Sequence, residues 1–131
     1  MRGLDTNILA RFLAADDSKQ LAAAQRVFEE CREADELLYL PAIVVCELVW
    51  VLDRRYGQSR TQICEALDHI LRIELFRFEH EALLRRSLEL FRAGRGQFPD
   101  YLIGEICRHA GCRDTVTFDR DLRGAPGYVI L

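Results

Sequence analysis

The chain is poor in the features that mark specialised classes of protein. Its 131 residues include 3 prolines and a single lysine, Lys19, with no internal repeat and no low-complexity stretch. A composition of 50% apolar and 30% charged residues excludes a disordered or fibrous chain. Residues 42–52 form the longest apolar run, and Glu47 interrupts it, so no membrane-spanning segment is expected. We therefore predict one globular domain over residues 1–131.

Sorting signals and paired cysteines are also missing. The amino terminus lacks the basic-then-apolar pattern of a secretory signal, and we expect a cytoplasmic protein. Five cysteines, an odd number with no CxxC pair, disfavour a disulfide framework or a redox motif. Their contexts are mostly apolar and helix-like, so we expect free, buried thiols at Cys31, Cys46, Cys64, Cys107 and Cys112.

The charge balance leaves nucleic acid open as a partner. A net charge of −3 argues against a strongly basic nucleic-acid binder. Arginine supplies nearly all of the positive charge, however, and its planar guanidinium suits phosphate groups. A cluster of acids that binds metal would also account for part of the negative excess. Charge alone therefore excludes neither RNA nor DNA.

Short apolar runs alternate along the chain with longer stretches whose apolar residues have helical spacing. Short runs predict strands at 1–4, 37–40, 73–78, 114–118 and 128–131. Helical spacing predicts helices at 6–14, 17–32, 43–55, 59–71, 80–92 and 99–110. Asp17 with Gln20, and Ser59 with Gln62, have the spacing of capping boxes, and Thr6 is a candidate N-cap. Strands separated by helices predict an α/β fold with a mostly parallel sheet covered on both faces.

Four acids recur where chain segments begin or end. Asp5 and Asp119 follow predicted strands, and Asp100 stands at a helix start. Glu47 is the one charge in an apolar helix, which suggests a buried carboxylate that needs a partner or a metal. The carboxyl edge of a parallel sheet gathers such positions into one crevice. Clustered carboxylates require a counter-charge, and Mg²⁺ or Mn²⁺ supplies it through oxygen ligands. Individually each acid also fits a simpler role: a turn residue, a helix cap or, for Glu47, an outward-facing side chain. Asp121, next to Asp119, is expected to be solvated or to support the site.

The same acids lie in motifs that resemble a known family. The motifs are Leu4-Asp5-Thr6-Asn7, Val45-Cys46-Glu47-Leu48 running on to Tyr56-Gly57, Asp100-Tyr101-Leu102-Ile103, and Thr117-Phe118-Asp119. In this order and spacing the chain resembles PIN-domain ribonucleases, and in particular the VapC-type toxins of bacterial toxin–antitoxin pairs. The resemblance covers essentially the whole chain.

The resemblance implies a fold and an activity. The fold would be a PIN-like three-layer α/β/α sandwich around a mostly parallel sheet of four to five short strands. The activity would be hydrolysis of RNA with Mg²⁺ or Mn²⁺, in which Asp5, Glu47, Asp100 and Asp119 bind metal and form the catalytic quartet. Thr6, Asn7 and Thr117 would support them. A hydroxyl residue often found before the second acid is missing, because Pro41-Ala42-Ile43 stand there.

Partners are implied in the same way. The resemblance indicates a VapB-like antitoxin and a homodimer, and Trp50, Leu48 and Tyr56 are candidates for a groove that takes the antitoxin helix. Arg95, on a Gly-flanked loop, and Arg11 are candidate contacts for RNA phosphates.

Other functions stay open. A non-catalytic PIN-like scaffold that binds protein is the main alternative. A receiver domain would need an acid beside Asp5, and a dehalogenase-type phosphatase would need Asp where Asn7 stands. Zinc binding by Cys107, His109 and Cys112 matches no standard spacing.

Overall fold

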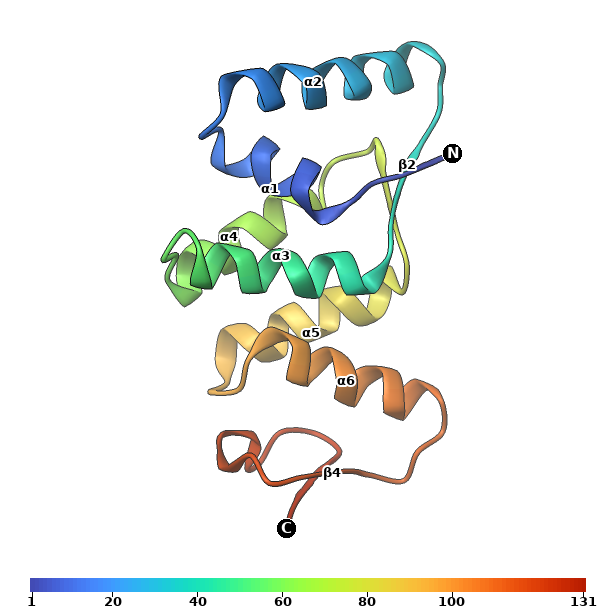
Figure 1. Ribbon diagram of the computed structural model, residues 1–131. Coiled ribbons are helices and arrows are strands. Elements are labelled where there is room, and N and C mark those ends of the chain that lie inside the picture. Colours follow the sequence, from blue (N-terminus) through green and yellow to red (C-terminus); the bar gives the residue numbers. More distant parts are fainter. The chain divides into compact units, whose positions relative to one another are not determined.

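Parallel strands and helices alternate through the protein, as a computed structural model of residues 1–131 shows (Figure 1). The chain divides into two compact units, Met1–Glu79 and His80–Leu131. The elements of the first unit are β1 (Arg2–Gly3), α1 (Thr6–Ala14), α2 (Ser18–Glu33), β2 (Leu38–Leu40), α3 (Ala42–Arg54), α4 (Arg60–Ile70) and β3 (Phe76–Phe78). Its three strands form one parallel sheet in the order β1-β2-β3.

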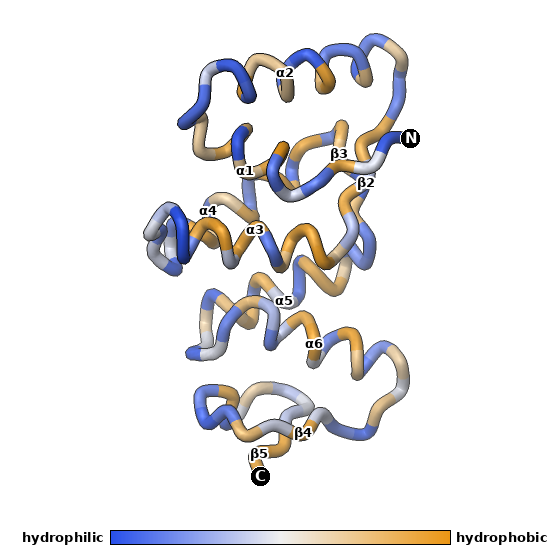
Figure 2. Tube along the Cα trace, viewed as in Figure 1, coloured by the Kyte–Doolittle hydropathy of each residue, from blue (hydrophilic) through white to orange (hydrophobic).

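The core of the first unit surrounds the central strand β2. Leu38 and Leu40 of β2 are fully buried, which fits a strand flanked on both sides. Helix α1 packs against both α2 and α3. The long orange stretch of α3 in Figure 2 marks its apolar residues, of which Leu48 and Leu52 are fully buried. Removal of this apolar surface from water is the main force that holds the helices on the sheet.

Local capping signals were largely correct. Ser59 and Gln62 form the predicted capping box at the start of α4, and the Asp17 side chain accepts a hydrogen bond from the Gln20 amide at the start of α2. The prediction of Thr6 as the N-cap of α1 is wrong. Thr6 is the first helical residue of α1, with Asp5 at the N-cap position, so its hydroxyl is free to bond elsewhere.

The second unit is a helical pair followed by a two-stranded sheet. Its elements are α5 (Glu81–Ala93), α6 (Phe98–His109), β4 (Thr115–Thr117), the 3₁₀ turn η1 (Arg120–Leu122) and β5 (Tyr128–Ile130). Helices α5 and α6 pack against each other, with the Phe91 and Phe98 rings edge-to-face at 6.0 Å. Strands β4 and β5 are parallel, with Val116 opposite Val129.

The predicted α/β fold with parallel strands is confirmed. All five strands and six long helices occur where they were predicted, within a few residues at each end. The sequence did not indicate that the hydrogen-bonded ladders divide into a three-stranded and a two-stranded sheet, nor that η1 follows β4. A three-residue turn is too short to produce a periodic signal.

Two further expectations concern cysteines and the membrane. All five cysteines are free, as predicted, but Cys112 is exposed and Cys46 and Cys107 are half-buried, so the expectation of buried thiols holds only for Cys31 and Cys64. None of the helices combines the length and the apolar character needed to cross a bilayer.

Candidate functional site

In the first unit, a buried threonine connects the two candidate acids. Thr6 is 4% exposed, and its Oγ1 donates a hydrogen bond of 2.6 Å to Oε2 of Glu47. This bond joins the first turn of α1 to the middle of α3, so Glu47 lies beside the residue that follows Asp5 in the chain. Both carboxylates are exposed. The apolar surroundings of Glu47 in the sequence suggested a buried charge, and the structure corrects that expectation.

Asn7 makes only a long contact with Asp5 in this structure. Its Nδ2 lies 3.5 Å from Oδ2 of Asp5, at the long limit for a hydrogen bond. Thr6 is therefore the better-defined support in this unit. Its role was predicted from the resemblance, but its bond partner on α3 was not.

In the second unit, both candidate acids accept a backbone hydrogen bond at the start of a helical turn. The Asp100 Oδ2 accepts from the Gln97 amide at 2.9 Å, in a capping box at the start of α6. The Asp119 Oδ1 accepts from the Asp121 amide at 2.9 Å at the start of η1, and the Asp119 amide donates to Thr117 Oγ1 at 3.1 Å. The simpler role as an N-cap is therefore real for Asp119, whereas Gln97 is the N-cap of α6 and Asp100 completes its capping box as the third helical residue. Each cap uses one carboxylate oxygen and leaves the other for a further ligand.

Tyr128 lies close to both acids and was missed by sequence reasoning. Burial, followed by the negative charge of Asp100, raises the pKa of Tyr128 to about 12, with a smaller contribution from Asp119. Its phenol donates a hydrogen bond to the backbone carbonyl of Asp100. Strand β5 is thereby joined to the start of α6, which fixes Asp100 relative to the end of the chain. Nothing in the sequence distinguishes this tyrosine from an ordinary core residue.

The four carboxylates suit a hard divalent cation in their chemistry. None of them forms an ion pair with arginine or lysine, so their charge is not compensated by the protein. Carboxylate oxygens are the ligands that Mg²⁺ and Mn²⁺ prefer. The acids are divided two and two between the units: Asp5 and Glu47 in the first, Asp100 and Asp119 in the second. No group of three or more metal-binding side chains is assembled.

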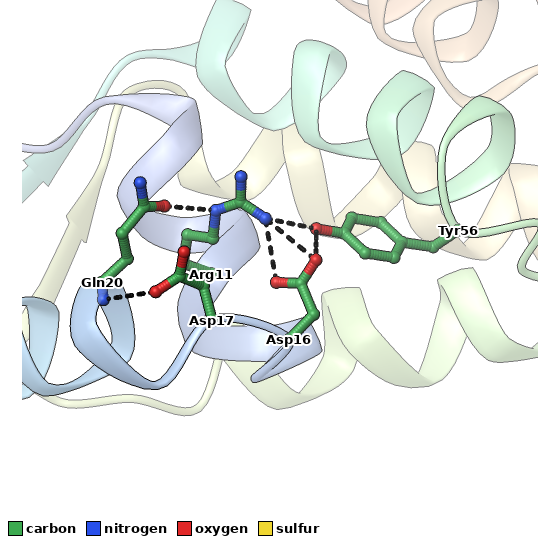
Figure 3. Close-up of polar contacts among 5 residues, drawn as sticks. All are labelled: Arg11, Asp16, Asp17, Gln20 and Tyr56. Carbon is green, nitrogen blue, oxygen red and sulfur yellow. Dashed lines mark hydrogen bonds and ion pairs between the residues drawn. The ribbon is translucent and has the colours of Figure 1, made fainter.

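The two candidate arginines have different surroundings. Arg95 is exposed, forms no ion pair and lines a cavity. Arg11 donates to both Asp16 oxygens at 2.9 Å, to Gln20 at 2.5 Å and to the Tyr56 hydroxyl at 3.1 Å (Figure 3). The hydrogen bond from Arg11, followed by one from the Tyr56 hydroxyl, lowers the pKa of Asp16. A contact between Arg11 and phosphate stays a prediction, and this structure gives the side chain a structural role.

Of the three residues predicted to line a helix-binding groove, only some are exposed to solvent. Leu48 is fully buried in the core, which corrects its assignment to a surface groove. Trp50 is 63% exposed on the same helix. Tyr56 is half-buried, and its hydroxyl donates to Asp16 at 2.9 Å. The zinc alternative gains no support, because Cys107, His109 and Cys112 form no metal-binding group.

Comparison with known proteins identifies the family. The PIN domain family matches residues 4–127, a range that contains all four candidate acids. The chain therefore belongs to the PIN domain family. It is also 32% identical over 120 residues to a VapC ribonuclease of Aquifex aeolicus (strain VF5), which covers 92% of this chain and 88% of that relative. The predicted VapC-type resemblance is thereby confirmed.

Proposed function

We propose that the protein is a metal-dependent endoribonuclease, the toxin of a toxin–antitoxin pair. The observation that carries the proposal is a set of four acids, at the motif positions of a PIN domain, that no arginine or lysine neutralises. The name of the relative, VapC ribonuclease, supports RNA as the substrate. The proposal requires the two units to work as one domain, since each supplies two of the acids.

Each residue then has a distinct task. Asp5, Glu47 and Asp100 would hold the metal directly or through water, and Asp119 would complete a second or weaker position. The bound Mg²⁺ or Mn²⁺ would acidify a water molecule and offset negative charge on the phosphate. Thr6 orients Glu47 through its 2.6 Å hydrogen bond, and Thr117 fixes the backbone at Asp119. Asn7 would have a lesser supporting role, and Arg95 and, more weakly, Arg11 would contact RNA phosphate.

Partner binding is part of the same proposal. Ile43 and Trp50 are 66% and 63% exposed on the helix that carries Glu47. An exposed apolar pair beside a candidate catalytic residue suits a VapB-like antitoxin or a second copy of the chain. The protein-binding scaffold remains the second candidate function, because the same surface would serve it without any chemistry.

Cleavage of RNA by purified protein tests the activity. Bulk cellular RNA is incubated with wild type, Asp100→Asn and Arg113→Gln, each with Mg²⁺, with Mn²⁺ and with a chelator. Wild type and the Arg113→Gln control should yield discrete fragments that require metal, and Asp100→Asn should yield none. Fragments that persist in Asp100→Asn or in chelator would contradict the assigned site. A complete absence of cleavage by wild type on cellular RNA would favour the scaffold.

A further inference from the structure

A cavity in the second unit combines cations with an apolar wall. It has a volume of about 330 Å³ and is lined by the end of α5, the loop that leads to α6, and residues 121–126. Its polar lining includes Arg95, Tyr101, Asp121 and Arg123. A volume near the lower end of the range for small-molecule sites is enough for a single nucleotide-sized ligand.

A buried hydroxyl in this lining has an unused donor. Tyr101 is 3% exposed, and its oxygen accepts a hydrogen bond of 3.0 Å from the Gly96 amide. Its own O–H has no acceptor within the protein, which is costly for a buried polar group. A Cβ on Gly94 would lie 1.9 Å from that oxygen, so glycine is needed for the loop to pass this closely. The loop therefore holds the hydroxyl in place while its hydrogen lacks a partner.

The cations of the cavity are also uncompensated. Arg95 and Arg123 are both exposed, and neither takes part in any ion pair. The one acid in the lining, Asp121, lies on η1. Two guanidinium groups and a phenolic donor together favour an anion with several acceptor oxygens, as in a phosphate group.

The rest of the lining suits the other parts of a nucleotide. Leu90, Ala125 and Pro126 supply apolar surface against which a base can lie, and Asp121 offers an acceptor for a sugar hydroxyl. The cavity is also linked to the candidate acids of its own unit. Tyr101 follows Asp100 in α6, and the Asp121 amide donates to Asp119. A nucleotide held here would lie on the same substrate strand as the bond that those acids cleave.

We propose that this cavity binds one nucleotide of the RNA substrate, with its phosphate held by Arg95, Arg123 and the Tyr101 hydroxyl. The inference rests on the proposed ribonuclease function for its choice of RNA. It assigns a binding role to Arg123 and Tyr101, which sequence reasoning did not single out. The cavity would position the strand and would not take part in the bond cleavage.

Binding without cleavage tests the inference first. Adenosine 5′-monophosphate, inorganic phosphate and adenosine are titrated in chelator into ¹⁵N-labelled wild type, Arg95→Gln, Arg123→Gln and Arg113→Gln. The control Arg113 is 94% exposed, pairs with Asp114 and lies outside the lining, so it matches the charge change. Wild type should bind the nucleotide more tightly than either fragment, with amide shifts at residues 94–96 and 121–125.

The variants decide between a specific site and general charge. Arg95→Gln and Arg123→Gln should each weaken nucleotide binding about tenfold, since each loses a charge-assisted contact, while Arg113→Gln stays within about twofold of wild type. Equal weakening in all three variants, shifts outside the cavity, or no binding to wild type would overturn the inference. Phosphate that binds as tightly as the nucleotide would also overturn it, because a free anion would then be the ligand.

Cleavage measured on the same variants separates this inference from the proposed function. If metal-dependent cleavage is lost in Asp100→Asn but Arg95→Gln and Arg123→Gln raise no KM, the ribonuclease stands and the cavity inference fails. If nucleotide binding depends on the two arginines but wild type cleaves no RNA, the nucleotide site stands and the ribonuclease fails. A higher KM with unchanged kcat in both arginine variants would support the two together.

Discussion

Glu47 and Glu105 occupy similar places in the sequence and opposite environments in the structure. Each lies on a helix among apolar neighbours, Glu47 on α3 and Glu105 on α6. Glu105 is 2% exposed and binds Arg108 at 2.7 Å and Arg86 at 3.1 Å. Glu47 is exposed and has the Thr6 hydroxyl as its partner, with no cation. Charge compensation therefore separates a carboxylate used by the fold from one left available for a ligand.

The electrostatics of Glu105 follow from this pairing. Burial by itself would raise its pKa, because it disfavours the charged form. Hydrogen bonds from Arg108 and then Arg86 outweigh that effect, and the pKa of Glu105 is lowered. The carboxylate is thus ionised in the folded protein, and its charge is compensated by two arginines that both contact Oε2.

The largest effect that sharpens the comparison is expected for Glu47→Gln. An amide is close in shape to the carboxylate but loses the charge that a metal requires. RNA cleavage should fall at least about 100-fold, because the metal contributes several kcal/mol to the reaction. Wild type should gain thermal stability with Mn²⁺ through binding to the folded state, and the variant should lose most of that gain.

The stability of Glu47→Gln in chelator is the internal control. Because Glu47 is exposed and compensates no cation, unfolding in urea without metal should be nearly unchanged. Equal stabilisation of wild type and variant by Mn²⁺ would remove Glu47 from the proposed metal site.

Sequence reasoning found the available carboxylate and missed the satisfied one. Glu47 was singled out because it interrupts an apolar helix and falls in a recognisable motif. Its exposure could not be predicted, since it depends on which face of α3 is covered. Glu105 belongs to no motif, and its partner Arg108 is visible in the sequence only as an i,i+3 spacing. Arg86 comes from α5 and is brought near by the packing of two helices, which no local pattern encodes.

The second prediction concerns the fold rather than the activity. Glu105→Gln should lower the free energy of unfolding by about 2 kcal/mol, since charge-assisted hydrogen bonds to two arginines are weakened inside the protein. Arg86 and Arg108 are about half-exposed and can turn to solvent, which limits the cost. Urea unfolding at pH 7 measures it. A loss of cleavage with no loss of stability would reverse the roles assigned to the two glutamates.

The fold as a whole was more predictable than the site. Short apolar runs located every strand and helical periodicity located every long helix, because burial leaves a local signal in the sequence. The Thr6 to Glu47 bond, the Tyr128 contact and the cavity at Arg95 each join residues distant in sequence. Such contacts are set by packing and have no local signature. The motif acids themselves were identified by resemblance.

The smallest effect expected is the dependence of the Glu105 contribution on pH. Its folded pKa lies below the ordinary value of 4.5, so the unfolded chain binds the proton more tightly. The stability that Glu105 supplies is therefore fully present above about pH 5 and is lost as pH falls through the folded pKa. The gap in unfolding free energy between wild type and Glu105→Gln should narrow as the pH is lowered from 7 to 3. In an Arg108→Gln background, the free-energy gap between Glu105 and Glu105→Gln should narrow less over the same pH range. The stronger of the two hydrogen bonds that lower the pKa of Glu105 is gone there. A gap that stays constant over this range would show that the carboxylate charge does not stabilise the fold, and the distinction between Glu47 and Glu105 would then have to rest on burial alone.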